Sequence, residues 1–317
     1  MGHGIDICIF CEPQQGATYD DLRRLALRTE ECGFDGFFRS DHYLHMGSVD
    51  GLPGPTDAWT TLAGLAVETS RVRLGTLVSP ATFRHPGPLA IAVATIDAMS
   101  GGRVDLGLGA GWYEAEHATY GLAFPPVGER FDILEEQLAI VTGMWGTPES
   151  ELFSYDGAHY RVTDSPARPK PFRPGGPTII VGGQGTRRTP ELAARYAGEF
   201  NSFTSVGTAA VAFDRVRAAS ERVGRAASGR KPIRFSATGT IFCGRTEAEA
   251  ADRANQAGAN IDRARSDGFY GTPEQIAQRV NAYREIGASR LFLQLPDLHD
   301  VDHVDAIARV LPLVFGT

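Results

Sequence analysis

The amino-acid sequence predicts an α/β fold, a closed (β/α)8 TIM barrel with one insertion. Three observations support this prediction. Short apolar strands alternate with helical patterns, eight such strands can be counted, and a length of 317 residues suits one barrel with an insertion. Residues 71–112 hold a complete strand, helix and strand, so these two strands should run parallel. We expect one domain over residues 1–317, with residues 147–177 inserted between the fourth and fifth strands.

The N-terminal half supplies four strand and helix pairs. The strands are expected at residues 5–10, 36–39, 72–78 and 103–109, where short apolar runs are bounded by Gly and Pro. The helices are expected at residues 19–32, 56–69, 86–99 and 127–145. In the first helix, four residues at helical spacing predict one buried face: Leu22, Leu25, Ala26 and Thr29.

The insertion has two parts. Residues 153–162 alternate around Asp156 and Gly157, which predicts a β-hairpin outside the barrel. Five prolines between Pro166 and Pro177 predict a stiff, extended connector. The four remaining strands are expected at residues 178–181, 199–203, 234–243 and 289–295, with helices from residue 190 and at residues 208–224, 246–265, 272–286 and 304–314.

A Gly-rich loop follows the fifth strand. Thr189 is the expected N-cap and Pro190 the first residue of the next helix, and Arg187 and Arg188 come just before them. Free backbone N–H groups, a helix dipole and two arginines together predict an anion site, most simply for a phosphate. The alternative is a solvent-exposed helix cap without a ligand.

The composition is that of a soluble globular enzyme, with 22% charged and 42% hydrophobic residues. A formal net charge of -7 gives no broad basic footprint, so we expect no nucleic-acid partner. The chain has no apolar run long enough for a membrane span and no N-terminal signal pattern, which predicts a cytoplasmic enzyme without a membrane partner. Four cysteines are too few for a disulfide framework. Cys8 and Cys11 have the spacing of a redox or zinc pair, but without a second pair they are expected to be buried thiols, and no metal site is expected.

Polar residues follow the second strand directly. Asp41, His42 and Tyr43 should therefore lie at the barrel mouth, where ligands of such folds bind. His42 is the best candidate to exchange a proton, because imidazole titrates near neutral pH. The alternative is that His42 only holds the loop by a structural hydrogen bond. His45, His85 and His117 are further mouth-side candidates, but they lack metal-ligand spacing.

Several motifs occur in a characteristic order: Gly33-Phe34-Asp35, Ser40-Asp41-His42, residues 73–76 (RLGT), residues 103–112 (RVDLGLGAGW) and Val181-Gly182-Gly183. In this respect the sequence resembles the bacterial luciferase-like monooxygenase superfamily, from about residue 5 to residue 313. The Ser-Asp-His form together with GAGW resembles its coenzyme F420-dependent oxidoreductase branch. The resemblance implies a single luciferase-like barrel domain, a deazaflavin across the mouth, and a homodimer.

The resemblance also implies site residues. Those expected to be catalytic are His42 and Asp41. Those expected to bind the cofactor are Asp41, Thr76, Leu77, Val78, Gly109, Ala110, Gly111, Gly182, Gly183, Gly185 and Thr186, with a non-proline cis peptide bond between Leu77 and Val78. Those expected to line the substrate pocket are Tyr43, Phe83, His85 and Trp112. Trp112 stands where the sugar-phosphate dehydrogenases of this branch carry a catalytic Glu, so a sugar phosphate is not expected as substrate.

Three functions follow as hypotheses. The first is an oxidoreductase that transfers a hydride between coenzyme F420 and a small organic substrate at the C-terminal mouth of the barrel. The second is an FMN-dependent monooxygenase of the same superfamily, which uses reduced flavin and dioxygen. The third is a barrel that binds a cofactor without turnover.

Overall fold

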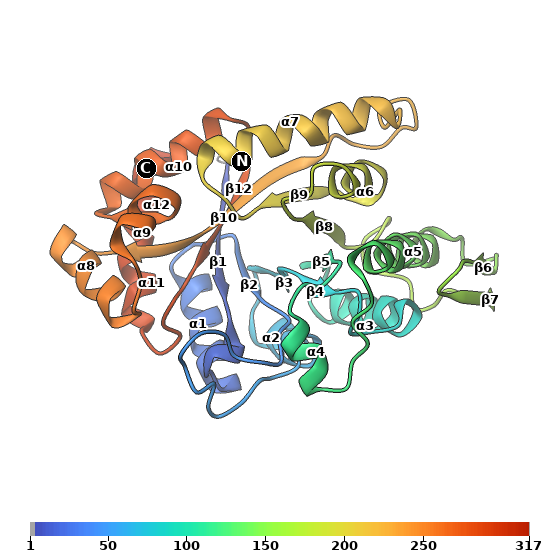
Figure 1. The fold of residues 1–317 in the computed structure, drawn as a ribbon, viewed down its shortest axis with the longest axis horizontal. Coiled ribbons are helices and arrows are strands. Elements are labelled where there is room, and N and C mark those ends of the chain that lie inside the picture. The colour runs from blue at the N-terminus through green and yellow to red at the C-terminus, as the bar shows by residue number, and fades with distance from the viewer. Residues whose placement is uncertain (1–3, 317) are drawn as a thin grey trace.

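The computed structural model describes residues 4–316, so the outermost ends of the predicted 1–317 domain lie outside the described residues. Eight parallel strands form a closed barrel surrounded by helices (Figure 1). In barrel order they are β1 (Asp6–Cys11), β2 (Gly36–Arg39), β3 (Arg73–Thr76), β5 (Val104–Gly109), β8 (Thr178–Gly182), β9 (Glu199–Ser202), β10 (Arg234–Cys243) and β12 (Arg290–Gln294). The last strand, β12, pairs with both β10 and β1, which closes the ring. The predicted (β/α)8 barrel is confirmed.

Four further strands complete the β structure of the described residues. β4 (Ser79–Pro80) pairs with β5, and β11 (Phe269–Gly271) pairs with β10. β6 (Phe153–Asp156) and β7 (Arg161–Ser165) form an antiparallel hairpin that projects away from the barrel (Figure 1). Because Asp156 pairs with Arg161, the turn of this hairpin is the four residues 157–160.

The helices on the outside are α1 (Tyr19–Glu31), α2 (Ala58–Glu68), α3 (Pro86–Met99), α5 (Val127–Gly146), α6 (Arg188–Tyr196), α7 (Val206–Arg222), α8 (Glu247–Gln256), α9 (Ile261–Asp267), α10 (Pro273–Glu285), α11 (Val301–Ala308) and α12 (Val310–Phe315). A 3-10 turn, η1 (Pro13–Gln15), follows β1, and a short helix, α4 (Glu114–Thr119), follows β5. Side-chain caps fix several helix starts. In α1, Thr18 and Asp21 form a reciprocal capping box, and in α2 the Asp57 carboxylate accepts from the Thr60 amide at 2.8 Å.

Four expectations about helices were wrong. The predicted helix 246–265 is two helices, because Gly258, at φ +63°, ends the first. The predicted helix 304–314 is likewise divided, at Arg309. The helix after the Gly-rich loop begins at Arg188, so Thr189 is inside it and is not the N-cap. Helix α4 lies in a segment that was expected to be a turn.

Side chains fill the barrel interior. An apolar cluster inside the ring consists of Cys8, Phe10, Phe38, Ile180 and Phe292, with Leu77 packed against it. At the N-terminal end of the barrel strands, the Arg290 guanidinium lies 3.0 Å from the carboxylates of Asp105 and Glu199. Because the interior is packed, a ligand must bind outside it, at the ends of the strands.

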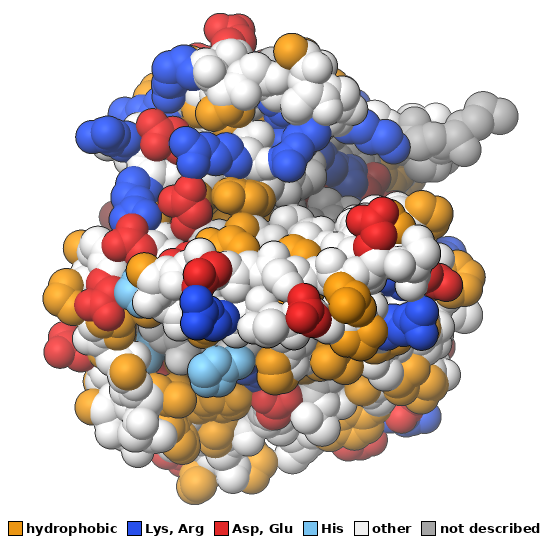
Figure 2. All heavy atoms as spheres, turned by 90° about the vertical axis from the view of Figure 1, so that its right-hand side faces the viewer, with side chains coloured by type: hydrophobic (Ala, Val, Ile, Leu, Met, Phe, Trp, Pro, Cys, Tyr) orange, Lys and Arg blue, Asp and Glu red, His pale blue; other side chains and the backbone are white. Residues whose placement is uncertain are grey.

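Charge is distributed unevenly over the surface. Residues 187–234 contain ten arginines and lysines against four aspartates and glutamates, although the whole chain is net negative. Figure 2 shows these basic side chains gathered in the upper part of one face, which carries α6 and α7. The expectation of no basic footprint therefore holds for the chain as a whole but not for this face.

Candidate active site

The carboxyl ends of the parallel strands bring polar residues from several loops to one end of the barrel. Glu12 directly follows β1, Ser40 to Tyr43 follow β2, and Ala110 follows β5. This is the end at which (β/α)8 enzymes place their active sites, because the loops there are supported by rigid strands.

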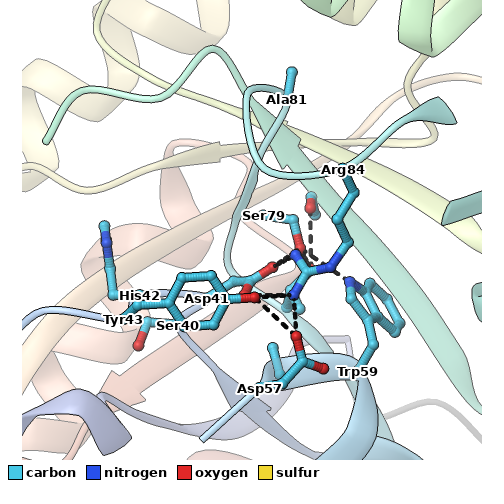
Figure 3. A network of polar contacts seen from close by, with 12 residues as sticks. Ser40, Asp41, His42, Tyr43, Asp57, Trp59, Ser79, Ala81 and Arg84 are labelled. Carbon is cyan, nitrogen blue, oxygen red and sulfur yellow. Dashed lines mark hydrogen bonds and ion pairs between the residues drawn. The ribbon is translucent and has the colours of Figure 1, made fainter. Parts of the chain in front are cut away.

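Asp41 is the centre of a buried ion network (Figure 3). Its carboxylate has no solvent exposure; it lies 2.5 Å from Nη1 of Arg84 and accepts a hydrogen bond of 2.6 Å from the Ser79 hydroxyl. The second terminal nitrogen of Arg84 lies 2.5 Å from Asp57 and 2.8 Å from the Tyr43 hydroxyl. Because both oxygens of Asp41 are engaged, this arrangement does not support the predicted catalytic role of Asp41; the residue instead ties the loop after β2 to the loop after β4.

The network also sets the protonation of its members. Burial raises the pKa of Tyr43, and the carboxylate of Asp41 adds to this effect. Burial alone would raise the pKa of Asp57, but the Thr60 amide and Arg84 hold it well below its usual range. Tyr43 therefore stays protonated and Asp57 stays ionised at neutral pH.

His42 points away from this network (Figure 3). Its Nδ1 atom lies 3.0 Å from Oε2 and 3.2 Å from Oε1 of Glu116, a fully buried carboxylate on α4. The backbone amides of Tyr43 and Leu44 also donate to Glu116. The Nε2 atom of His42 has no hydrogen-bond partner among the described residues. His42 is therefore oriented by a residue 74 positions further along the chain and not by its neighbour Asp41.

A second carboxylate, Glu12, lies at the mouth. Its Oε2 atom accepts a hydrogen bond of 2.7 Å from Gln294, whose Oε1 accepts from Thr240 at 2.8 Å. Burial raises the pKa of Glu12, and the positive charge that His42 can carry opposes that rise. Glu12 and His42 are therefore electrostatically coupled groups that can hold a proton at the mouth.

The end of β3 has the geometry that the resemblance implied. The peptide bond between Leu77 and Val78 is cis, as expected. The Thr76 hydroxyl donates to the Gly107 carbonyl at 3.0 Å, and the Leu77 amide donates to the Arg39 carbonyl at 2.8 Å. Leu77 and Val78 are half-buried, so both remain accessible at the mouth.

The glycines that follow β5 have structural reasons of their own. A Cβ atom at Gly109 would lie 2.9 Å from a Val78 methyl group, and Gly111 has φ +79°, a conformation that favours glycine. Ala110 is half-buried between them. Trp112, next along the chain, is 64% exposed and its ring lies 5.8 Å from the His42 ring. Trp112 is thus an exposed aromatic surface beside the candidate proton carrier.

The loop after β8 offers unpaired amides, although not all of those expected. The Gly182 amide lies in the strand ladder and the Gly183 amide faces the Asn201 carbonyl at 3.4 Å. From Gln184 to Arg187, including Gly185 and Thr186, the backbone amides have no partner among the described residues. Arg188, which was expected to face an anion, instead donates to Gly128 and Asp132. Any anion site in this loop therefore depends on the amides of 184–187 and on Arg187.

The remaining predicted residues are divided between the mouth and its edge. Phe83 stacks on Tyr43 with ring centroids 5.0 Å apart. His85 is exposed and lies 5.8 Å from the Tyr160 ring of the insertion. His117 is buried, with a bond of 2.6 Å to Thr82, so it does not face the mouth.

Within residues 4–316, no group of three or more His, Cys, Asp or Glu side chains is arranged to hold a metal ion.

Three residues of the site were not found from the sequence. Glu12 follows a buried strand directly, as Asp41 does, and that signal could have identified it. Arg84 lies in a loop whose path no local pattern predicts. Glu116 lies in the six residues of α4, which are too few to show a buried face by periodicity.

Comparison with known proteins places these observations in context. The sequence profile described as luciferase-like monooxygenase matches residues 1–269. Over 180 residues, the chain is 38% identical to the F420-dependent glucose-6-phosphate dehydrogenase of Microbacterium testaceum, a match that covers 56% of this chain and 51% of that protein. The chain thus spans about half the length of the curated relatives it matches.

Solved structures share the fold over the whole chain. An F420-dependent secondary alcohol dehydrogenase, in complex with an F420-acetone adduct, superposes with a TM-score of 0.82 at 19% identity, covering 99% of each chain. The oxygenating constituent of 3,6-diketocamphane monooxygenase from Pseudomonas putida, in complex with FMN, gives 0.74 at 18% identity, again covering 99% of each. At these identities the likeness concerns the fold.

Among the helices of residues 4–316, none combines the length and the apolar character that a membrane span requires.

Proposed function

The chain belongs to the luciferase-like monooxygenase family, and from this premise we propose that it is an oxidoreductase that transfers a hydride between coenzyme F420 and a small organic substrate. The observation that carries the proposal is His42 just after β2, held by Glu116 through Nδ1, while Nε2 has no hydrogen-bond partner within residues 4–316. The 38% identity to an enzyme named as F420-dependent supports the cofactor. We further propose that residues 1–317 act as one domain and that the protein is a homodimer.

The residues present fit a flat cofactor that carries a phosphate. The unpaired amides of residues 184–187 suit an anion, and Gly183, at φ +139° with no atom within 3.4 Å of a built Cβ, leaves room for one. Leu77 and Val78 would contact the flat ring system. When bound, F420 supplies or accepts the hydride, and the protein contributes position and proton transfer.

His42 is the proposed catalytic residue. In the oxidation of an alcohol, its Nε2 atom would accept the hydroxyl proton as the hydride leaves the carbon; in the reverse direction the protonated ring would return it. Glu12, with its raised pKa, would take up or release the next proton. His42 and Glu12 therefore act only by orienting the substrate and moving protons.

The mouth suits an uncharged, partly apolar substrate. Arg84 is already bound to two carboxylates, so it has no charge to offer a phosphate. Trp112, Phe83 and Tyr43 present aromatic surface instead. We therefore propose a secondary alcohol or its ketone as substrate class, in preference to a sugar phosphate.

Anaerobic turnover tests this proposal. The purified protein is mixed with F420 and a series of secondary alcohols and, separately, with glucose 6-phosphate, and the F420 absorbance is followed without dioxygen. Loss of the oxidised absorbance with an alcohol, but not with the sugar phosphate, is the expected result. Turnover that requires reduced FMN and dioxygen would support the monooxygenase alternative, and tight F420 binding without turnover of any substrate would support the non-catalytic one.

A further inference from the structure

Glu116 makes four contacts to one loop. Its two oxygens lie 3.0 and 3.2 Å from Nδ1 of His42, and Oε1 also accepts from the amides of Tyr43 and Leu44, the latter at 3.1 Å. The side chain has no solvent exposure, although it lies on a short helix that is otherwise mostly exposed. A buried carboxylate is costly unless donors satisfy it, so this residue has a specific role in the loop.

We propose that Glu116 is a positioning residue for His42: it holds the imidazole with its proton on Nδ1 and so leaves Nε2 as the atom that exchanges a proton with the substrate. The physical reason is that a carboxylate only accepts hydrogen bonds, so the ring nitrogen that faces it must carry hydrogen. The use to which Nε2 is put rests on the proposed function; the tautomer itself does not.

Other groups around His42 do not take this role. Asp41 is adjacent in sequence but is bound to Arg84 and Ser79. Glu12 is bound to Gln294 and has no hydrogen bond to the imidazole. The rings of Trp112 and Tyr113 contact the imidazole edge to face, with centroids 5.8 and 6.2 Å away, and carry no charge. Glu116 is therefore the one acceptor that faces Nδ1 among the described residues.

Glu116 also acts on the charged form of the ring. A carboxylate 3.0 Å from an imidazole that is taking up a proton stabilises the imidazolium, and burial strengthens the interaction. Removing this charge favours the neutral ring. The imidazolium that forms when Nε2 takes up the substrate proton would then be less stable, so turnover would fall.

The first test measures the tautomer in the protein without cofactor. ¹⁵N-labelled histidine is introduced and the ring nitrogens of His42 are assigned by comparison with His42→Asn. The expected spectrum at pH 8 has hydrogen on Nδ1 and a bare Nε2. A spectrum with hydrogen on Nε2 would overturn the inference whether or not the protein turns over F420, and this test does not require Glu116→Gln to fold.

The second test replaces the carboxylate by an amide of the same shape. In Glu116→Gln the amide oxygen can still accept from the Tyr43 and Leu44 amides, but the NH2 group cannot accept from Nδ1. Turnover should fall at least 100-fold, with the Kd for F420 within about threefold of the wild-type value. Glu129→Gln, which changes an exposed glutamate of α5, is the matched control and should alter neither the turnover nor the Kd for F420.

The two proposals can fail separately. If the wild-type protein does not turn over F420 but His42 has hydrogen on Nδ1, the proposed function fails and the role of Glu116 stands. If F420 turnover is present and Glu116→Gln, shown to be folded by circular dichroism, keeps the wild-type rate, Glu116 is only structural. If Glu116→Gln does not fold, the tautomer in the wild-type protein decides.

Discussion

The Nδ1 atom of His42 lies 3.0 Å from the Oε2 atom of Glu116, which joins the loop after the second barrel strand to the helix after the fourth. The orientation of His42 is thus set by a tertiary contact and not by its neighbours in the sequence. A closed barrel makes this contact possible, because it brings the carboxyl ends of distant strands to one rim.

Replacing His42 by Asn should remove most of the activity while leaving the cofactor in place. A general acid–base group typically contributes about 10²–10⁴ in rate, so kcat should fall by that range. The Kd for F420 should stay within about threefold. Steady-state kinetics and a fluorescence titration measure both quantities, and wild-type turnover across the pH range would make His42 a structural residue.

Replacing Arg84 by Met should destabilise the protein strongly. Among the described residues, the change leaves the fully buried Asp41 carboxylate with only the Ser79 hydroxyl as a hydrogen-bond partner. Breaking a buried pair in this way costs about 3–5 kcal/mol. Urea unfolding should show this loss, and adding Asp41→Asn should restore at least about 1 kcal/mol by removing the uncompensated charge. The matched control is Arg161→Met, which breaks the exposed pair with Asp156 and should cost much less stability. Equal losses at both sites would contradict the role given to Arg84.

Replacing Arg187 by Ala should weaken F420 binding. The residue is exposed, its side chain has no polar contact among the described residues, and it adjoins the backbone amides of residues 184–186, which have no partner there either. We expect Kd to rise about three- to tenfold at low salt, and the effect to shrink as salt screens the charge. Arg230→Ala, an exposed arginine of the loop before β10, serves as control. If both variants bind as the wild type does, the loop after β8 is not the anion site.

His303 predicts a specific pH dependence of stability. It is buried and its Nε2 accepts from the Cys243 amide at 3.0 Å, and burial, with Arg253 adding, lowers its pKa to about 3. In the unfolded chain a histidine has a pKa of about 6.5, so between these values the unfolded state binds a proton that the folded state does not. The free energy of unfolding should therefore fall as the pH drops below about 6.5.

His303→Gln keeps an acceptor for the Cys243 amide but removes this titration. Between pH 7 and pH 5, the variant should lose about 2 kcal/mol less stability than the wild-type protein. His159→Gln, at an exposed position of the insertion, should follow the wild-type curve. Urea titrations at both pH values give the comparison. Parallel curves for wild type and His303→Gln would contradict the assignment.

The sequence predicted the barrel well because its signals are local. The apolar runs of β1 and β2 and the face of α1 formed by Leu22, Leu25, Ala26 and Thr29 can be read from spacing, and all four of these α1 residues are buried. The site could be predicted only in part. His42 and Trp112 follow strands and were therefore expected at the mouth, but Glu116, the residue that orients His42, comes from another loop. Arg84 and Glu116 meet Asp41 and His42 across 43 and 74 residues, and no spacing rule encodes such contacts.

The most direct test of the central claim is the relative affinity of the protein for F420 and FMN. Each cofactor is titrated into the same preparation and its fluorescence is followed to saturation. The account predicts that F420 binds at least tenfold more tightly than FMN, and that unlabelled F420 displaces bound FMN. Tighter binding of FMN, with F420 unable to displace it, would contradict the account and assign the protein to the flavin-dependent members of its family.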